Sequence, residues 1–406
     1  MPPAVADGLR DRGEYNVGGM TDSRWTRREF LSTSAMGIVG LAAHRDGRGV
    51  EERLAYVGTY TTDGRSEGIY RLFLNSETGA LRLDGVAAKS ANPSYLALHP
   101  NGRVLYAVNE LSEFRDEPTG AVSAFVVARG SGALTPLNQQ PSHGKAPCYV
   151  SVDRTGRVVL VANYGGGSLT TFPVRQDGSL ETAKTVVRHD GTGADPVRQT
   201  APHAHCVLPD PSNRYVLAVD LGIDAVLTYR LDERTGSIAV VTRGAATKPG
   251  AGPRHLTFHP NGRFAYLVNE LDSTLSVFAY DGEHGALDEV QVTAASPGGT
   301  VADNHPADVH VAASGRYLYS SNRGDDTIAV FAIDPASGQV TPVQQIPSGG
   351  RSPRNFTLDP SGRFLIAANQ RSDGIVSFRV DGESGRLTPT GSSVELAAPV
   401  CVKFHA

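Results

Sequence analysis

The sequence predicts an all-β fold, a seven-bladed β-propeller of four-stranded blades, and three observations support this prediction. The 406 residues include 45 glycines and 25 prolines without low-complexity tracts, which indicates many tight turns between short strands. A turn that ends in Gly-Arg or Asn-Arg recurs roughly every fifty residues, and a unit of that length holds four short strands. The spacing between the first two strands of each unit is almost constant.

The repeated turn marks six units along the chain. Its arginines are separated by 54, 57, 49, 53 and 47 residues. The turns are HPNGR (99–103), DRTGR (153–157), DPSNR (210–214), HPNGR (259–263), AASGR (312–316) and DPSGR (359–363).

The first two strands of each unit form a hairpin of nearly fixed length. A Pro that begins the first strand precedes the Asn that ends the second by 16 residues in five units, and Pro202 precedes Asp220 by 18 in the sixth. The variation in unit length must therefore lie in the outer strands and connections, where insertions are tolerated. The five constant pairs are Pro93 and Asn109, Pro147 and Asn163, Pro253 and Asn269, Pro306 and Asn322, and Pro353 and Asn369.

The two ends of the chain supply a seventh blade. The segment APVCVKF (398–404) has the pattern of a first strand, whereas LAYVGTY (54–60), GIYRLFL (68–74) and GALRLDG (79–85) have the patterns of the other three. Joining them closes the ring and leaves no long free sheet edge there. We therefore expect residues 50–406 to form one propeller domain. A sandwich followed by a second all-β domain would not explain the constant spacing.

Residues 1–49 differ in kind from the rest. In TRREFLSTSAMGIVGLAA (26–43), Arg27 and Arg28 precede an apolar run that is too short to span a bilayer. This order is typical of a twin-arginine export signal, so we expect a protein that is exported to the cell envelope or the medium. The alternative is a disordered tail with a chance arginine pair, which would leave the protein in the cytoplasm.

Composition narrows the possible partners. The net charge of -4 gives no reason to expect nucleic acid or an anionic membrane as a partner, because both require a basic surface. Cys148, Cys206 and Cys401 lie far apart in apolar strands, which predicts buried thiols and neither a disulfide framework nor a metal site. We expect a monomer that acts on a small molecule.

One end of each hairpin carries ionisable residues that the repeat does not require. In the stretch 253–270, pairing about the turn places Arg254 opposite Asn269 and His255 opposite Val268, so Arg254 and Glu270 share the end away from the turn. If the Pro-led strands are innermost, the equivalent ends of all blades meet at one mouth of the ring. The residues after the Pro are Ser94, Cys148, His203, Arg254, Ala307, Arg354 and Val400, and those after the Asn or Asp are Glu110, Tyr164, Leu221, Glu270, Arg323 and Gln370.

Two segments add polar side chains beside this mouth. Alternation along a strand places the two histidines of the first segment on the same face. A His pair at this spacing near acids could bind zinc or another divalent ion, but no spacing fixes a third ligand, so we expect no metal and no other cofactor. The residues are Arg198, Gln199, His203 and His205 in RQTAPHAH, and His305, Asp308 and His310 in NHPADVH.

The chain resembles the propeller lactonase family, which includes 6-phosphogluconolactonases and a branch of cyclic muconate lactonising enzymes. The resemblance covers about residues 55–404 and rests on RQTAPHAH, AVDLGIDAV, GAGPRHLTFHPNGRFAYLVNEL, SNRGDDTIAVF and SPRNFTLDPSGRFLIAANQ. It implies one seven-bladed propeller without an obligatory metal, and a site of one His, two Arg and one Glu at the mouth. Matched by motif, these are His203, Arg254, Glu270 and Arg323, with His203 preferred to His205 because it follows the Pro.

The resemblance implies hydrolysis of a small sugar lactone or a related lactone, and the residue types suit that chemistry. The reaction requires an activated water, stabilisation of the oxyanion and a proton for the leaving alkoxide. We expect Glu270 or His203 to act as general base, and Arg254 and Arg323 to bind the substrate's anionic group and the oxyanion. Further substrate-binding candidates are Arg198, Gln199, His205, Glu110, Asp308 and Arg354.

Three alternatives remain open from the sequence. Arg254 and Glu270 could form only a salt bridge that closes the hairpin. A carboxymuconate-type lactonising enzyme would use nearly the same residues in the reverse direction, and an exported, non-catalytic propeller could bind a ligand at the same mouth. The presence of the whole His-Arg-Glu-Arg set favours an enzyme. Export favours an unphosphorylated lactone, because phosphorylated sugar lactones are cytoplasmic metabolites.

Overall fold

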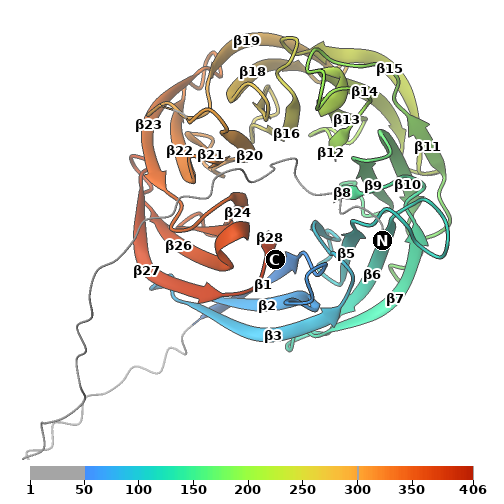
Figure 1. Cartoon of the computed structure of the whole chain (residues 1–406), viewed down its shortest axis with the longest axis horizontal. Helices are drawn as coiled ribbons and strands as arrows, with labels where there is room; N and C mark the ends of the chain where they lie inside the picture. The colour runs from blue at the N-terminus through green and yellow to red at the C-terminus, as the bar shows by residue number, and fades with distance from the viewer. Residues whose placement is uncertain (1–50, 300, 406) are drawn as a thin grey trace, which may run out of the picture. The chain divides into compact units, whose positions relative to one another are not determined.

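The computed structural model describes residues 51–299 and 301–405, so the predicted export signal lies outside the described residues. The described chain forms seven antiparallel sheets of four strands, arranged in a ring (Figure 1). The predicted seven-bladed propeller is confirmed. In this part of the chain the helical segments are two short 3-10 turns, η1 (Leu221–Ile223) and η2 (Gln370–Ser372), and no helix is long and apolar enough to cross a membrane.

The blades are numbered here in chain order, and their strands run from the innermost to the outermost (Figure 1). Blade 1 contains β28 (Pro399–Phe404), β1 (Glu52–Thr59), β2 (Gly68–Asn75) and β3 (Leu81–Lys89). Blade 2 contains β4 (Leu96–Leu98), β5 (Val104–Asn109), β6 (Ala121–Val127) and β7 (Leu134–Pro141). Blade 3 contains β8 (Pro147–Val152), β9 (Val158–Asn163), β10 (Ser168–Pro173) and β11 (Thr185–Arg188). Blade 4 contains β12 (Ala204–Pro209), β13 (Tyr215–Asp220), β14 (Ala225–Asp232) and β15 (Ser237–Ala246). Blade 5 contains β16 (Pro253–Phe258), β17 (Phe264–Asn269), β18 (Thr274–Asp281) and β19 (Ala286–Ala294). Blade 6 contains β20 (His305–Val311), β21 (Tyr317–Arg323), β22 (Thr327–Ile333) and β23 (Val340–Pro347). Blade 7 contains β24 (Pro353–Leu358), β25 (Phe364–Asn369), β26 (Gly374–Val380) and β27 (Leu387–Glu395).

Blade 1 joins the two ends of the described chain. β28 pairs antiparallel with β1, for example Val402 with Val57, and β1 continues the sheet to β2. Closure by N- and C-terminal strands in one blade is therefore confirmed, and the ring has no open edge at this point.

The core of the ring lies between neighbouring blades. The second strands β5, β9, β13, β17 and β25 are buried at every position, because both faces of these strands pack against other blades. This explains why these strands are almost continuously apolar in the sequence and do not alternate.

A hydrogen bond from a hydroxyl group recurs between each blade and the next. A Tyr on a second strand, or a Ser or Thr on a third strand, donates a hydrogen bond of 2.7–3.0 Å to the carbonyl of a glycine in the outer turn of the following blade. These glycines have φ between 65° and 87°, a left-handed conformation that favours glycine. The pairs are Tyr56–Gly132, Tyr106–Gly178, Thr171–Gly236, Thr228–Gly285, Tyr266–Gly338, Tyr319–Gly385 and Ser377–Gly79.

The innermost strands carry a β-bulge at the end away from the hairpin turn. In blade 5, His255 pairs with Val268 as predicted, but Pro253 pairs with Asn269 and Arg254 is the extra residue. The predicted pairing of Arg254 with Asn269 is wrong because the bulge takes up one position. A bulge redirects the side chain of its extra residue. The equivalent extra residues are Cys148, His205, Arg354 and Val400 in blades 3, 4, 7 and 1.

Candidate active site

A pocket opens where the bulged side chains meet near the ring axis. Five of its lining residues are bulge residues, and a sixth, Ser94, directly follows Pro93 in blade 2. Six blades thus contribute the same structural position to one site, which is the convergence that the repeat predicted. The lining consists of Ser94, Tyr95, Glu110, Cys148, His205, Arg254, His255, Arg354 and Val400.

The histidine at this position in blade 4 is His205. Ala204 pairs with Asp220 in the same way that Pro253 pairs with Asn269 in blade 5. The longer spacing in this unit is therefore an insertion of two residues before the strand begins. The placement of His203 at the mouth position is wrong for this reason.

His203 lies beside the pocket and is half-buried. Its Nδ1 donates a 3.0 Å hydrogen bond to the carbonyl of Tyr164, and its ring stacks on the Tyr164 ring with centroids 4.4 Å apart. These contacts hold the imidazole against blade 3, and His203 is absent from the pocket lining.

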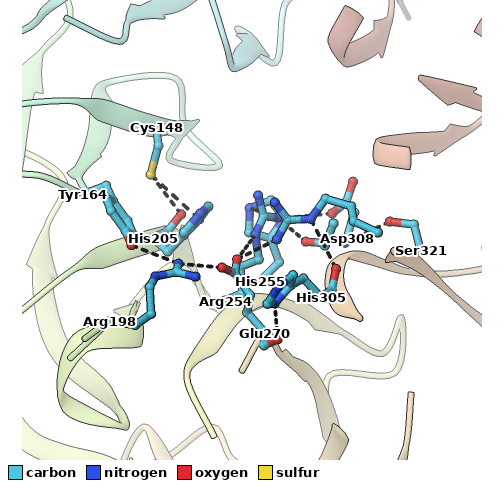
Figure 2. A network of polar contacts seen from close by, with 12 residues as sticks. Cys148, Tyr164, Arg198, His205, Arg254, His255, Glu270, His305, Asp308 and Ser321 are labelled. Carbon is cyan, nitrogen blue, oxygen red and sulfur yellow. Dashed lines mark hydrogen bonds and ion pairs between the residues drawn. The ribbon is translucent and has the colours of Figure 1, made fainter. Parts of the chain in front are cut away.

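Glu270 is the centre of a cluster of three arginines, of which Figure 2 labels Arg198 and Arg254. It directly follows β17, and its two carboxylate oxygens accept hydrogen bonds from Nη2 of Arg198 at 2.7 Å, Nε of Arg254 at 2.9 Å and Nη2 of Arg323 at 2.7 Å. Arg254 is 1% exposed and Glu270 3%. The structure thus brings together three of the four predicted catalytic residues, and Arg198 joins them from the connection between β11 and β12.

The cluster fixes the charge of Glu270. Burial opposes ionisation, but the charges of Arg323, Arg254 and Arg198 outweigh it and hold the pKa of Glu270 well below its usual value. Burial and the like charges of Arg323 and Arg354 lower the pKa of Arg254 to about 10. All four groups are therefore charged at neutral pH, and two positive charges remain after Glu270 is balanced.

His205 faces the pocket as an uncharged imidazole. Burial, followed by the charge of Arg254, lowers the pKa of His205 well below its usual value. Its Nδ1 lies 3.8 Å from the Cys148 thiol, and its ring meets that of His255 at a centroid distance of 5.2 Å. The neutral imidazole of His205 keeps a nitrogen lone pair that can accept a proton from water, whereas the carboxylate oxygens of Glu270 are occupied by three guanidinium groups.

The remaining predicted substrate-binding residues fall into two groups. Glu110 and Arg354 line the pocket, where Glu110 accepts hydrogen bonds from Ser94 and from Tyr60. Gln199 does not lie in the lining, since its amide is used inside the chain to bind Leu221, Asp224 and the backbone N–H of Asp195.

Asp308 also differs from its predicted role. It is 2% exposed, lies behind His255 and is absent from the pocket lining. His310 donates to its carboxylate at 3.1 Å, while His305 contacts the carbonyl of Glu270 at 3.2 Å. In the described ranges no group of three or more His, Cys, Asp or Glu side chains is arranged to hold a metal ion. The three cysteines are buried free thiols, as predicted.

His255 also lines the pocket, a role that its place in the repeat did not predict. Regular alternation would turn it away from the face of Arg254, but the bulge places both neighbours beside the pocket. The available signal was the dipeptide Arg-His at a strand start, where the other blades have Ser-Tyr, Cys-Tyr, His-Cys, Ala-Asp, Arg-Asn and Val-Cys.

These features define a seven-bladed β-propeller with an arginine-carboxylate cluster and a polar pocket near its axis. The family described as "Lactonase, 7-bladed beta-propeller" matches residues 54–404, so the chain belongs to that family. It is a lactone hydrolase similar to 6-phosphogluconolactonases.

Two curated relatives and one solved structure support this placement. The 6-phosphogluconolactonase of Bacillus subtilis is 40% identical over 351 residues, which cover 86% of this chain and 98% of that protein. The 6-phosphogluconolactonase of Formosa agariphila is 32% identical and covers 75% of this chain and 86% of its own length. The periplasmic gluconolactonase of Pseudomonas aeruginosa has a TM-score of 0.81 at 37% identity, covering 88% of this chain and 99% of that chain.

Proposed function

We propose that the protein opens an unphosphorylated sugar lactone, of the gluconolactone type, by adding water at the pocket described above. The observation that carries this proposal is the surplus of positive charge around Glu270 beside a neutral imidazole. Lactone hydrolysis converts a neutral carbonyl into an oxyanion and then a carboxylate, both of which this surplus would stabilise.

The proposed mechanism gives each side chain one task. His205 lines the pocket as a neutral imidazole and accepts a proton from the attacking water through its nitrogen lone pair. Arg254, which lines the pocket, donates a hydrogen bond to the carbonyl oxygen as negative charge develops on it. Arg323 is absent from the pocket lining but binds the same carboxylate as Arg254, so its positive charge adds to the stabilisation from a distance. The protonated His205 then returns its proton to the ring oxygen when the C–O bond breaks. Glu270 holds the three guanidinium groups in place.

The choice of an unphosphorylated substrate rests on export and on Glu110. Residues 26–43 favour export by the twin-arginine route, and the relative from Pseudomonas aeruginosa is a periplasmic gluconolactonase. Glu110, which accepts hydrogen bonds from Ser94 and Tyr60, places a carboxylate in the pocket lining, and its negative charge would repel a phosphate group. The monomeric state and the absence of a cofactor requirement stay predictions.

A pH-stat assay tests the activity. Purified protein should release acid from glucono-1,5-lactone faster than from 6-phosphogluconolactone, and Arg254→Ala should lower kcat/KM by about 100-fold, the loss typical of an oxyanion donor. Arg263→Ala is the matched control, because Arg263 is an exposed arginine at the turn of the same hairpin. No turnover of either lactone, or equal activity in both variants, would refute the proposal.

A separate fractionation experiment tests export. Changing Arg27 and Arg28 together to Lys should retain the protein inside the cell. Unchanged export of the double variant would rule out the twin-arginine route, whatever the assay shows.

A further inference from the structure

We propose that His255 and Asp308 form a buried positioning pair that aims the guanidinium of Arg254 at the reacting carbonyl. This inference rests on the proposed function only for its catalytic consequence, since the geometry of the pair stands by itself. Both residues are almost fully buried, His255 at 4% and Asp308 at 2% exposed.

The hydrogen bonds assign the tautomer of His255. Its Nδ1 lies 2.9 Å from Oδ1 of Asp308, a carboxylate that only accepts, so Nδ1 carries the proton. Its Nε2 lies 3.2 Å from Nη1 of Arg254, a group that only donates, so Nε2 offers its lone pair. A protonated imidazole would place an N–H against the guanidinium, so the imidazole must be neutral. The pKa of His255 agrees with this, because burial and then the charge of Arg254 lower it to about 3.

Asp308 is itself held from several sides. His310 lies 3.1 Å from Oδ2, and the side-chain amide of Asn355 donates to the same oxygen. The backbone N–H of Val309 donates to Oδ1 at 3.0 Å. The carboxylate therefore cannot turn away from His255 without breaking bonds to blade 7 and to its own strand.

The pair leaves one face of Arg254 for the substrate. Nε donates to Glu270, and Nη1 donates to His255 and to the carbonyl of Ala307. Among the described residues none accepts a hydrogen bond from Nη2, although Arg254 lines the pocket. A guanidinium fixed on its other two nitrogens presents Nη2 in a set direction, which is the requirement for a donor that stabilises an oxyanion.

Substitution of His255 separates positioning from general stability. His255→Phe keeps an aromatic ring but removes both hydrogen bonds, whereas His255→Gln can still accept from Arg254 and donate to Asp308. His259→Phe is the matched control, because His259 is also buried, accepts from the N–H of Asn261 and contacts the carbonyl of Gly315 in blade 6 at the opposite end of the hairpin.

This test uses a lactone that the wild-type protein hydrolyses. Relative to the wild type, we expect the kcat of His255→Phe to fall about 100-fold and its KM to change less than about threefold. His255→Gln should recover at least about a tenth of the wild-type kcat, and His259→Phe should stay within about twofold. Equal kcat in His255→Phe and His259→Phe, or no recovery in His255→Gln, would overturn the proposal.

A second readout does not depend on activity. In long-range ¹H–¹⁵N spectra of protein labelled at histidine, the signals that His255→Gln removes should report a proton on Nδ1 and none on Nε2 between pH 5 and pH 8. A proton on Nε2 would overturn the positioning pair even in an active enzyme. The Nδ1 tautomer in a protein without lactonase activity would refute the proposed function and leave the geometry intact.

Discussion

Nε of Arg254 lies 2.9 Å from Oε2 of Glu270, across the end of the first hairpin of blade 5. A bridge that only closed the hairpin would need these two residues alone. The same carboxylate also binds Arg198, which precedes blade 4, and Arg323 of blade 6. One buried carboxylate therefore binds three guanidinium groups from successive parts of the ring. The excess positive charge can attract an anionic group to the pocket.

Glu270→Gln should reduce both activity and stability. The amide removes the negative charge and leaves three arginines close together, two of them buried. Breaking a buried ion pair on one side typically costs about 3–5 kcal/mol, and we expect kcat/KM to fall at least about 100-fold because the guanidinium groups lose their common anchor. Urea unfolding and the pH-stat assay measure the two effects.

The control for this substitution is Glu283→Gln, at an exposed turn of the same blade. It should change neither the urea midpoint nor kcat/KM. A Glu270→Gln variant that is as stable and as active as this control would show that the cluster has no functional role.

His205→Gln should impair hydrolysis more than His203→Gln. His205 lines the pocket, whereas His203 is held against Tyr164 beside it. Loss of a general base typically costs 10²–10⁴-fold, so we expect kcat of His205→Gln to fall by at least about 100-fold, with less than about fivefold for His203→Gln. The reverse order in the pH-stat assay would restore His203 as the catalytic histidine.

These two histidines also show how far the sequence could predict the site. The 16-residue spacing located the blades, the closure of the ring and the hairpin ends of Arg254 and Glu270, because those features follow from a repeated pattern. The sequence also shows the longer spacing of 18 residues between Pro202 and Asp220, but it does not indicate whether the two extra residues lie before the strand or inside the hairpin. The pairing of Ala204 with Asp220 places them before the strand.

The bulge is the second feature that the sequence does not determine. The extra residue follows a Pro in blades 1, 3, 5 and 7 but follows Ala204 in blade 4, so the residue type alone does not determine the bulge. Without the bulge, His255 would face away from Arg254, so its contact with Asp308 could not be predicted. Likewise, Gln199 looked available as a polar residue in a loop, although its amide is used to fasten that loop.

The pH dependence of hydrolysis should lack an acid limb near the usual histidine pKa. His205 and Glu270 both have pKa values held well below their usual ranges. A base with a lowered pKa stays unprotonated as the pH falls, until the pH reaches that lower value. We therefore expect kcat/KM to vary less than about twofold between pH 7.5 and pH 5.5, after subtraction of spontaneous hydrolysis. A sigmoidal loss centred near pH 6.5 would contradict the assignment of His205 as the base.

The bonds that join the blades allow a test of the fold that leaves the pocket untouched. Gly338 has φ of 75° and a carbonyl that accepts from Tyr266, and an added Cβ would lie 2.4 Å from a ring carbon of Phe264. The free energy of unfolding of Gly338→Ala should therefore fall by about 3 kcal/mol, about 1 kcal/mol from the left-handed backbone and the rest from the clash.

Gly362→Ala is the control, because its φ is 69° but no atom lies within 4 Å of the added Cβ, so only the backbone cost of about 1 kcal/mol applies. Urea unfolding of the two variants measures the difference. Both variants should keep the wild-type kcat while folded, because Gly338 lies in the outer turn of blade 6, Gly362 lies in the hairpin turn of blade 7, and neither lines the pocket. Equal midpoints for the two variants would show that the outer turns are not packed against the preceding blades.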